Sequence, residues 1–583
     1  MFDEDIKYTD ILDANRRLGK CLSGAQYNIA VLSNIVTYKF NDIFEYFLRK
    51  ENINAHVKSG NYDNIVQDSQ ALEDVNLVIV FWEAANFVEG LHYMVNVMDQ
   101  EQTEELEGKI KTDISFVLEN LKKVPLVIFN RFSPLLFNYQ NIRQNKFDRL
   151  CENLNRYLEA AALENVKLVD INKVITQVSV KKSIDERFYY SSKALYSVEF
   201  YKCYTAYIRR AILSVHGKSK KVFVFDCDDT LWKGIVAEDG FDGIEMSRKT
   251  KDGAIFEEIQ YQVLKLCKQG VILGLCSKNN PSDIDEVFAR HPDMVLRKEH
   301  ITIKKVNWND KVSNLKEIAN ELNVAFDSLV FIDDSDFDLN FVKAQLPQVT
   351  VLKVPEKLYE YPSMLRKCAE LFFALSESDE DIRRTALYRQ QQEREHAKSK
   401  YSNLEEYLES LKLRLIIHVD ARTIVPRIAQ MTQKTNQFNL TTKRYTESEI
   451  NKFVENDGYK IFAFDAHDKF GCYGITGLCI VHFENNKKKC YIDSFLMSCR
   501  VIGRNLEFSF FDFIVSTLKA AGVEEIEGRY VKTIKNSQVS DFYDKVGFQV
   551  VRSSEKEKVY RLEISRYRGK KVTYVQTEYG KGN

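Results

Sequence analysis

The residues best suited to chemistry are three carboxylates crowded behind an apolar run, in VFVFDCDDTLW. Asp226, Asp228 and Asp229 lie within one stretch of four residues, and like charges this close repel one another unless something neutralises them. A second acidic pair, Asp333 and Asp334, also follows an apolar run, in SLVFIDD. Because Mg²⁺ prefers carboxylate oxygens, the two groups together predict a magnesium site.

Between the two acidic groups lie a serine and a lysine that complete a set for phosphoryl transfer. Ser277 ends the run GVILGLCS and can donate a hydrogen bond to a phosphoryl oxygen, and Lys311 can neutralise phosphate and nucleophile. Asp226 would attack phosphorus, and Asp228 would exchange a proton with the leaving oxygen. One DxD after a strand can equally be a turn or a helix cap, but four such elements in order favour a catalytic site.

The elements that must position these residues have the pattern of a parallel sheet. The apolar runs 221–226, 270–277 and 328–334 are predicted as buried strands, with helices over 253–269 and 311–322. Ligands of such open sheets bind outside the carboxyl ends of the strands. The acidic residues, the serine and the lysine are therefore expected at one edge of the sheet.

Two further regions flank this one. Residues 27–215 alternate between apolar strands and amphipathic helices, as in a parallel sheet covered on both faces, whereas strands dominate from 414 to 570, which suggests an α+β domain. The highly charged stretch 377–412 lacks Gly and Pro and is predicted as connector helices. The expected fold class is a multidomain α/β protein, and the expected boundaries are 1–217, 218–375, 376–413 and 414–583.

Composition limits the function classes. The chain has 583 residues, too many for one hydrophobic core, and its net charge of −1 provides no field that would recruit nucleic acid or an anionic membrane. The N-terminus has no apolar signal core, and no apolar run is long enough to span a bilayer. Eleven cysteines without a CxxC pair predict reduced thiols in the cytoplasm.

The four motifs resemble, in order, those of the haloacid dehalogenase (HAD) superfamily. The resemblance implies that Asp226 becomes an aspartyl-phosphate and that Asp228 is the general acid/base and offers its backbone carbonyl to Mg²⁺. It implies Asp334, with Asp333, as the acidic metal-binding motif, and Asp338 as a supporting acid. Since only 51 positions separate Asp226 from Ser277, no large cap domain fits between them, and an open, cap-less Rossmann-like site is expected.

Three longer strings resemble the FkbH-like subfamily of HAD proteins: TLWKGIVAEDG (230–240), VNWNDKVSNLKEIANELN (306–323) and TQKTNQFNLTTKRYTESEI (432–450). Such proteins take 1,3-bisphosphoglycerate, remove phosphate and deliver the glyceryl unit to the phosphopantetheine thiol of an acyl carrier protein. The resemblance therefore implies a phosphorylated three-carbon acid as substrate and a carrier protein as partner. A plain phosphatase acting on a small phosphomonoester, and a carrier-binding scaffold with an idle site, remain as alternatives.

Residues next to the motifs are expected to contact the substrate; these are Thr230, Trp232, Lys278 and Asn279. Cys227, between the two first aspartates, has two interpretations. It could carry the acyl group as a thioester, or it could fill the core, because successive side chains of a strand point to opposite faces; we favour the core.

The C-terminal region resembles the GNAT acyltransferase fold, in which a strand-to-helix turn binds the pyrophosphate of coenzyme A. Here RVIGRN supplies Arg500, Gly503 and Arg504, but Asn505 occupies the last small position, so coenzyme A is not expected as the cofactor.

Two further residues, Asn536 and Tyr543, lie where GNAT enzymes contact the cofactor or the leaving thiol. Two interpretations remain open: this domain holds the phosphopantetheine arm of a carrier protein, which we favour slightly, or it is a scaffold.

The N-terminal region resembles the SGNH hydrolase fold. Ser33 stands where the nucleophile would be and Gly60 where the oxyanion glycine would be, but Phe188 stands in place of the catalytic histidine. A serine without its base is a poor nucleophile, so a non-hydrolytic domain is expected.

Overall fold

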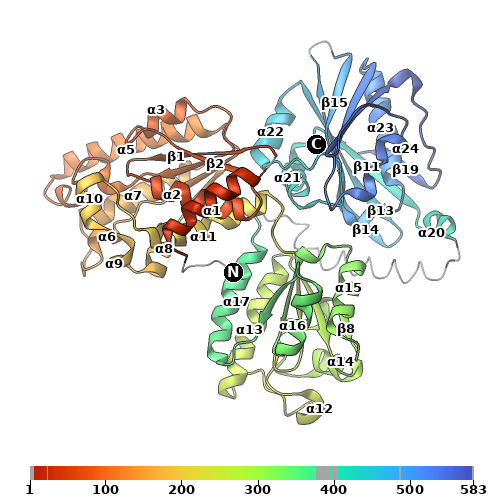
Figure 1. The fold of residues 1–583 in the computed structure, drawn as a ribbon, viewed down its shortest axis with the longest axis horizontal. Coiled ribbons are helices and arrows are strands. Elements are labelled where there is room, and N and C mark those ends of the chain that lie inside the picture. Colours follow the sequence, from red (N-terminus) through yellow and green to blue (C-terminus); the bar gives the residue numbers. More distant parts are fainter. Residues whose placement is uncertain are drawn as a thin grey trace. The chain divides into compact units, whose positions relative to one another are not determined.

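The computed structural model describes residues 6–22, 24–375, 394, 401, 403–484 and 487–580. The chain forms two compact units, Met1–Ile212 with Thr446–Glu449, and Leu213–Tyr445 with Ile450–Asn583 (Figure 1). Most of the connector expected at 376–413 lies outside the described residues; near its end, α20 (Leu404–Ser410) is helical.

The first unit is built on a five-stranded parallel sheet in the order β2-β1-β3-β4-β5. This order is that of flavodoxin-like doubly wound folds. The strands are β1 (Tyr27–Ser33), β2 (Ala55–Ser59), β3 (Leu77–Phe81), β4 (Leu126–Asn130) and β5 (Val166–Val169). The main helices are α1 (Tyr8–Cys21), α2 (Tyr38–Lys50), α3 (Ile65–Gln70), α5 (Gln100–Leu121), α7 (Lys146–Ala161), α8 (Ile171–Val178) and α11 (Val198–Val215).

The second unit begins with another five-stranded parallel sheet, in the order β10-β9-β6-β7-β8. Its strands are β6 (Val222–Phe225), β7 (Ile272–Ser277), β8 (Ile301–Val306), β9 (Leu329–Asp333) and β10 (Thr350–Lys353). Its helices are α12 (Val236–Asp239), α13 (Lys251–Lys268), α14 (Pro281–Arg290), α15 (Lys311–Glu321), α16 (Asp336–Gln345) and α17 (Tyr361–Ala369). We call residues 218–375 the middle domain.

The central strand β6 separates two cores by simple alternation. Val222 and Val224 pack with α15 and α16 on one face, whereas Phe223 and Phe225 pack with α13, α14 and α17 on the other. Because the side-chain period of a strand is two residues, the residues that follow β6 are directed alternately toward the α15 face and toward the aromatic core.

The remainder of the second unit, which we call the C-terminal domain, is a mixed sheet in the order β17-β18-β16-β15-β14-β13-β11-β19, with the short β12 paired to β15. The strands are β11 (Leu413–Val419), β12 (Phe438–Asn439), β13 (Tyr459–Asp468), β14 (Gly471–Phe483), β15 (Lys489–Met497), β16 (Glu525–Val531), β17 (Gln549–Ser553), β18 (Glu557–Glu563) and β19 (Val575–Tyr579). The helices are α21 (Val425–Lys434), α22 (Glu447–Glu455), α23 (Leu506–Ala520) and α24 (Phe542–Lys545). Helix α23 covers one face and α21 the other, so the α+β arrangement expected for this region is present.

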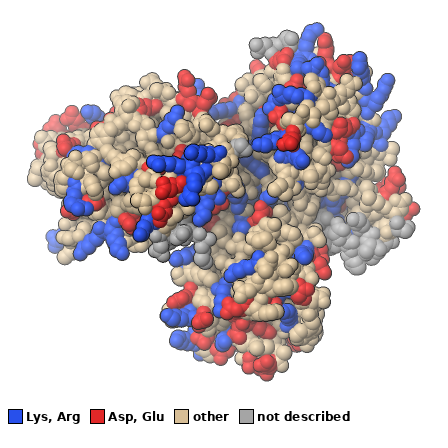
Figure 2. Space-filling view, viewed as in Figure 1, with Lys and Arg blue, Asp and Glu red and all other residues tan. Residues whose placement is uncertain are grey.

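Charged side chains of both signs are interspersed over most of the surface visible in Figure 2. Such mixing agrees with a net charge near zero. Within the described part of the chain, no helix has the length and apolarity that crossing a bilayer would require.

Candidate active site

Three carboxylates meet at the carboxyl edge of the middle sheet. Asp226 directly follows β6, and Asp333 and Asp334 lie at the end of the neighbouring β9. One carboxylate oxygen from each of the three lies within 4.8 Å of the others. The backbone N–H of Asp226 donates to the carbonyl of Ile332 at 3.0 Å, which fixes the end of β6 against β9. The sequence prediction that the two acidic groups converge is therefore correct.

Lys311 is the cation that holds this cluster together. It is the first residue of α15 and only 2% exposed, and its Nζ donates to Asp226 and to the carbonyl of Cys276 (2.7 Å). The same Nζ lies 3.2 Å from Asp333 Oδ2. Burial alone would lower the pKa of Lys311, but the carboxylates of Asp226 and Asp333 outweigh burial and raise it. Lys311 therefore stays charged at neutral pH.

One lysine does not neutralise three carboxylates, of which Asp226 and Asp333 are buried and Asp334 is exposed. Burial raises the pKa of Asp226 to about 6 even though Lys311 opposes the shift. Burial raises the pKa of Asp333 as well, and burial together with Asp226 raises that of Asp334. A hard dication would relieve this repulsion, and an all-oxygen donor set is what Mg²⁺ prefers. The residues present therefore fit the expected magnesium ion.

The side chain of Asp228 lies outside this cluster and is held separately. Its Oδ1 accepts hydrogen bonds from Trp232 Nε1 at 3.0 Å and from the backbone N–H of Val236 at 3.2 Å, and its Oδ2 accepts one from Asn279 Nδ2 at 2.8 Å. These three donors fix the orientation of the carboxylate. A metal contact through the backbone carbonyl of Asp228 stays a prediction.

Ser277 and its two successors support the site from β7. Asn279 Nδ2 donates a hydrogen bond to Ser277 Oγ at 3.1 Å, so the Ser277 hydroxyl can donate its own proton to another acceptor. Lys278 pairs with Asp338 at 2.8 Å, which ties the end of β7 to α16. Asn279 and Lys278 thus position neighbours, and the expectation that they contact substrate is untested.

The structure corrects the roles expected for two residues next to the first motif. Trp232 and Thr230 are both 0% exposed, so neither is placed to touch a ligand. Trp232 packs against Phe288 and orients Asp228, and the carbonyl of Thr230 accepts a hydrogen bond from Tyr361 at 3.0 Å. Both are core residues that hold the loop after β6.

Cys227 is also a core residue. It is 0% exposed and packs with Phe223 and Phe225 in the aromatic core. Burial and the charge of Asp226 raise the pKa of its thiol well above the usual range. Since the thiolate is the nucleophile, the alternative of an acyl-carrying thiol at this position is wrong, and the core interpretation is right.

Two exposed aromatic side chains at the same sheet edge were missed. Trp308, in the loop after β8, is 69% exposed, and Phe337, at the start of α16, is 76% exposed. Single exposed apolar side chains are common on protein surfaces, so what distinguishes these two is their position after β8 and β9, at the sheet edge where the carboxylates lie. A signal existed in the sequence, because each stands among polar residues just after a strand, in VNWND and DDSDFD.

In the C-terminal domain, most residues expected to bind a cofactor are turned inward. Arg504 is 6% exposed, and its guanidinium donates to the carbonyls of Arg500 and Ile502 in its own loop. Gly503 has φ +80° and Asn505 φ +59°, and the Asn505 amide donates to Tyr574 Oη at 2.7 Å. The turn that was expected to bind a pyrophosphate is therefore a loop whose polar groups largely form hydrogen bonds within the protein.

Asn536 and Tyr543 are likewise structural rather than ligand-binding. Asn536 is 0% exposed, and its amide donates to the carbonyls of Asn439 and Val531, both at 2.9 Å. Tyr543 is 1% exposed and packs against Phe548 and Tyr560. The expectation that these two contact a cofactor is corrected by their burial.

The arrangement of β12, β15 and β16 around Asn536 explains why its side chain is buried. β15 and β16 are parallel, but they pair only through their first residues, at Lys489–Glu525 to Tyr491–Glu527. Farther along, β12 pairs with β15, and Val531 N–H donates to the carbonyl of Leu440 at 2.8 Å. The chain itself therefore fills the opening between the diverging strands, where an extended ligand could otherwise pair with the free strand edges.

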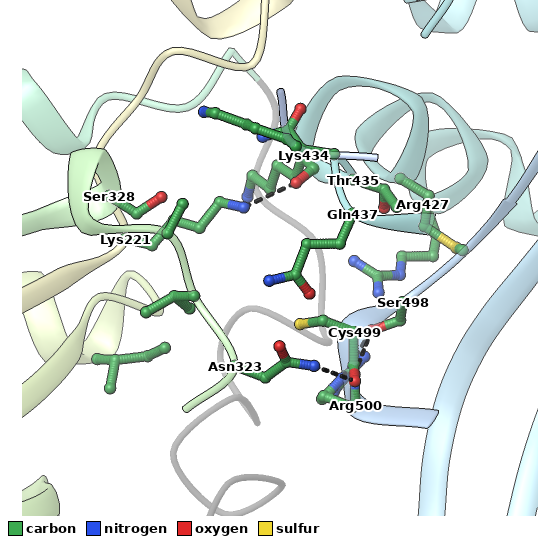
Figure 3. A pocket seen from close by; sticks show the side chains of 16 residues that line it. Lys221, Asn323, Ser328, Arg427, Lys434, Thr435, Gln437, Ser498, Cys499 and Arg500 are labelled. Atoms are coloured by element: carbon green, nitrogen blue, oxygen red, sulfur yellow. Dashed lines mark hydrogen bonds between the residues drawn. The ribbon is translucent and has the colours of Figure 1, made fainter. Parts of the chain in front are cut away.

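Arg500 faces a cavity of about 90 Å³ between the middle and C-terminal domains (Figure 3). Nζ of Lys221 donates to the carbonyl of Lys434 at 2.7 Å, and Asn323 Nδ2 donates to the carbonyl of Cys499 at 3.0 Å across this boundary. No carboxylate side chain is among its lining residues in the described chain. Its cationic lining residues are Lys221, Arg427, Lys434, Arg500 and Lys535.

In the first unit, Ser33 lies at the end of β1 with its hydroxyl turned to the backbone, donating to the carbonyl of Ile35 at 2.7 Å. Phe188 is 46% exposed in the short α10 (Glu186–Ser192). A Cβ added at Gly60 would approach the Asp68 carboxylate to 2.4 Å, so this glycine is required by packing. No histidine contact to the Ser33 hydroxyl occurs in the described residues, and a non-hydrolytic domain stays a prediction.

The role of Lys311 predicts a stability effect. Lys311→Met should lower the free energy of unfolding by about 3 kcal/mol, because it leaves Asp226 and Asp333 buried without a cation. The measurement is urea unfolding at neutral pH, with and without Mg²⁺, which should restore part of the loss. Lys305→Met is the matched control, since Lys305 pairs with Glu317 and Glu321 at the surface and should cost less than about 1 kcal/mol. Equal losses in the two variants would contradict the assigned role.

Neither a protein-family model nor a curated protein matches the chain. Among solved structures, the N-terminal part of the protein BF1531 from Bacteroides fragilis, which contains a phosphatase domain and was solved with Mg, is 24% identical. The match covers 64% of this chain and 100% of that one, with a TM-score of 0.55. An acetyltransferase of the GNAT family from Desulfovibrio desulfuricans (13% identity, 26% of this chain and 99% of that one, TM-score 0.20) and the ribosomal-protein-S18-alanine N-acetyltransferase of Escherichia coli (12%, 26% and 94%, 0.21) also match. The chain thus shares, over much of its length, the fold of a protein that contains a phosphatase domain.

Proposed function

We propose that this protein is a Mg²⁺-dependent phosphatase or phosphotransferase of the HAD type, with Asp226 as the nucleophile. The observation that carries the proposal is the convergence of Asp226, Asp333 and Asp334 around one buried lysine at the carboxyl edge of a parallel sheet. The Mg-bound phosphatase-domain structure of similar fold supports it.

The chain's own residues account for each step. A carboxylate oxygen of Asp226 forms a bond to phosphorus as the bond from phosphorus to the leaving oxygen breaks, and Asp228 gives its proton to that oxygen. Lys311 and the Ser277 hydroxyl lie beside Asp226, where they would balance charge on the phosphoryl oxygens. Water then cleaves the aspartyl-phosphate, and Asp228 accepts its proton. Bound Mg²⁺ supplies charge neutralisation for the phosphoryl group.

The finer proposal concerns the substrate and the acceptor. On the resemblance to FkbH-like proteins, the substrate is a phosphorylated three-carbon acid such as 1,3-bisphosphoglycerate, and the acyl group passes to the phosphopantetheine thiol of an acyl carrier protein in the cytoplasm. The thiol sulfur would bond to the acyl carbon as the bond from that carbon to the phosphate oxygen breaks, so that inorganic phosphate leaves and takes up the thiol proton. The remaining phosphoester would be hydrolysed at Asp226.

An open site favours such a protein-borne substrate. Between β6 and β7 the chain contains only α12 and α13, so no inserted domain covers the carboxylates. The exposed Trp308 and Phe337 flank the edge where the carboxylates lie and offer apolar contacts to a docked protein. Coenzyme A is not proposed as a cofactor, because β12 fills the strand opening of the C-terminal domain.

Loss of the nucleophile should abolish turnover. Asp226→Asn should reduce Mg²⁺-dependent hydrolysis of an aryl phosphate by at least about 10³-fold, since no other residue of the cluster can form the phospho-enzyme. Asp336→Asn is the control: Asp336 lies at the surface and pairs with Lys353 at 2.6 Å, so its activity should be normal. A wild-type chain without turnover would leave the scaffold interpretation, whereas an active Asp226→Asn variant would mean that the nucleophile is mis-assigned.

The Asp228 environment generates a second kinetic expectation. Trp232→Phe removes one of three donors to this carboxylate, which should lower kcat about 10-fold with little change in KM. Trp308→Phe is the control for loss of an indole. An unchanged kcat in Trp232→Phe would refute a positioning role.

Carrier loading separates transferase from phosphatase. The full chain, Mg²⁺, 1,3-bisphosphoglycerate and a pantetheinylated carrier are incubated, and the intact mass of the carrier is measured. A gain of one glyceryl group is expected in the wild type; release of inorganic phosphate without a mass gain would favour the plain phosphatase.

The double variant Trp308→Ala, Phe337→Ala tests the docking surface in the same assay. It should lose most carrier loading and retain hydrolysis of the aryl phosphate, because both side chains lie outside the carboxylate cluster. Equal loss of both activities would argue against carrier docking at this edge.

A further inference from the structure

Three metal-ligating side chains gather on one face of the C-terminal sheet, far in sequence from the carboxylate site. They are Asp465 and His467 from β13 and Cys472 from β14, and their ligand atoms all lie within 4.8 Å of one another. A fourth side chain, His418 from the neighbouring β11, borders this group through Asp465: its Nε2 lies 3.3 Å from Asp465 Oδ2.

Strand register explains why these side chains lie together. His467 stands directly opposite Cys472, and Ile416, two residues before His418, stands opposite Asp465. The β13–β14 ladder is shifted between Phe464 and Asp465 and again between Ala466 and His467. Such irregularities re-aim side chains out of the regular pleat, and they are over-represented next to functional sites.

The spacing of three ligand atoms suits a zinc ion. Zinc bonds of about 2.0 Å to nitrogen or oxygen and about 2.3 Å to sulfur, at tetrahedral angles, separate neighbouring ligand atoms by about 3.3 to 3.6 Å. The ligand atoms of Asp465, His467 and Cys472 lie within 4.8 Å of one another, and Asp465 Oδ1 and Cys472 Sγ are 3.9 Å apart. Bound zinc would draw these atoms closer together, with water in the remaining position of the tetrahedron.

The chemistry of the donor set selects zinc over magnesium. Thiolate and imidazole are ligands of borderline-soft metals, unlike the oxygens around Asp226. The backbone N–H of Gly474 donates to Cys472 Sγ at 3.1 Å, and hydrogen bonds of this kind from outside the ligand set orient and stabilise a metal ligand. We propose that Asp465, His467 and Cys472 bind a zinc ion at the β13–β14 hairpin, with His418 of β11 held against the ligand Asp465.

The charged side chains nearby are engaged with other partners and do not interfere with a bound ion. Arg414 stands opposite His467 in the β11–β13 register, and its guanidinium lies 3.8 Å from Glu578 of β19, so its charge is directed to the next strand. Asp468 is engaged with Arg394 at 2.7 Å and does not compete as a ligand. Binding replaces the thiol proton of Cys472 with the metal, so one proton is released into solution.

Cobalt(II) serves as the spectroscopic probe on the full chain. Wild type should bind one equivalent with a thiolate-to-metal charge-transfer band in the near ultraviolet and the intense visible bands of a tetrahedral centre. Cys472→Ser should lose the charge-transfer band, and Cys21→Ser, which removes an exposed cysteine of α1, should keep it. Asp226→Asn should also keep it, which separates this site from the carboxylate cluster. No thiolate band in the wild type, or a band that survives Cys472→Ser, would overturn the proposal.

Thermal unfolding provides a second measurement of metal binding that does not depend on an absorption spectrum. Zinc at about a hundred times its Kd should raise the Tm of the wild type and of Cys21→Ser by about 5 to 10 °C. Cys472→Ser, a nearly isosteric change at an exposed position, should fold but show little or no shift. An equal zinc-induced shift in Cys472→Ser would place the bound metal elsewhere and overturn the assignment.

Discussion

The middle domain depends on one buried ion-pair arrangement, in which the single ammonium of Lys311 lies between Asp226 and Asp333. A lysine in the first turn of a helix opposes the helix dipole, so the position is unfavourable for α15 considered alone. The carboxylates at the ends of β6 and β9 compensate, and they in turn remain ionised beside one another because the lysine is there. The adjacency of β6 and β9, the start of α15 and the ionisation of the carboxylates at this edge therefore depend on one another.

Successive side chains of β6 and of the two residues after it point alternately toward α15 and toward the aromatic core. Val222, Val224 and Asp226 belong to the α15 face, whereas Phe223, Phe225 and Cys227 belong to the aromatic core. This alternation places Asp226 beside Lys311 and buries the thiol of the adjacent Cys227 in the aromatic core.

The sequence allowed the carboxylate site to be predicted well because its members follow strands or begin helices, and parallel strands bring such positions to one edge. The predictions for Trp232, Asn536 and Tyr543 failed for a common reason. A motif position does not reveal burial, and each of these side chains is enclosed by segments distant in sequence: α14 over Trp232, β12 beside Asn536, and β18 beside Tyr543. The grouping of Asp465, His467 and Cys472 was equally hidden in the sequence, because it depends on the register between β13 and β14.

Topology also constrains how an acyl group could reach a carrier protein. The cationic cavity beside Arg500 is lined by Lys221, Ile272 and Ser328, which lie at the amino ends of β6, β7 and β9, opposite the carboxylates. From Lys221 to Asp226 the strand direction spans about 16 Å, and both faces of the sheet are covered by packed helices. A ligand in that cavity therefore cannot touch the carboxylate cluster through the domain. In the proposed function, a phosphopantetheine thiol would have to approach from the open carboxyl edge, where Trp308 and Phe337 are exposed.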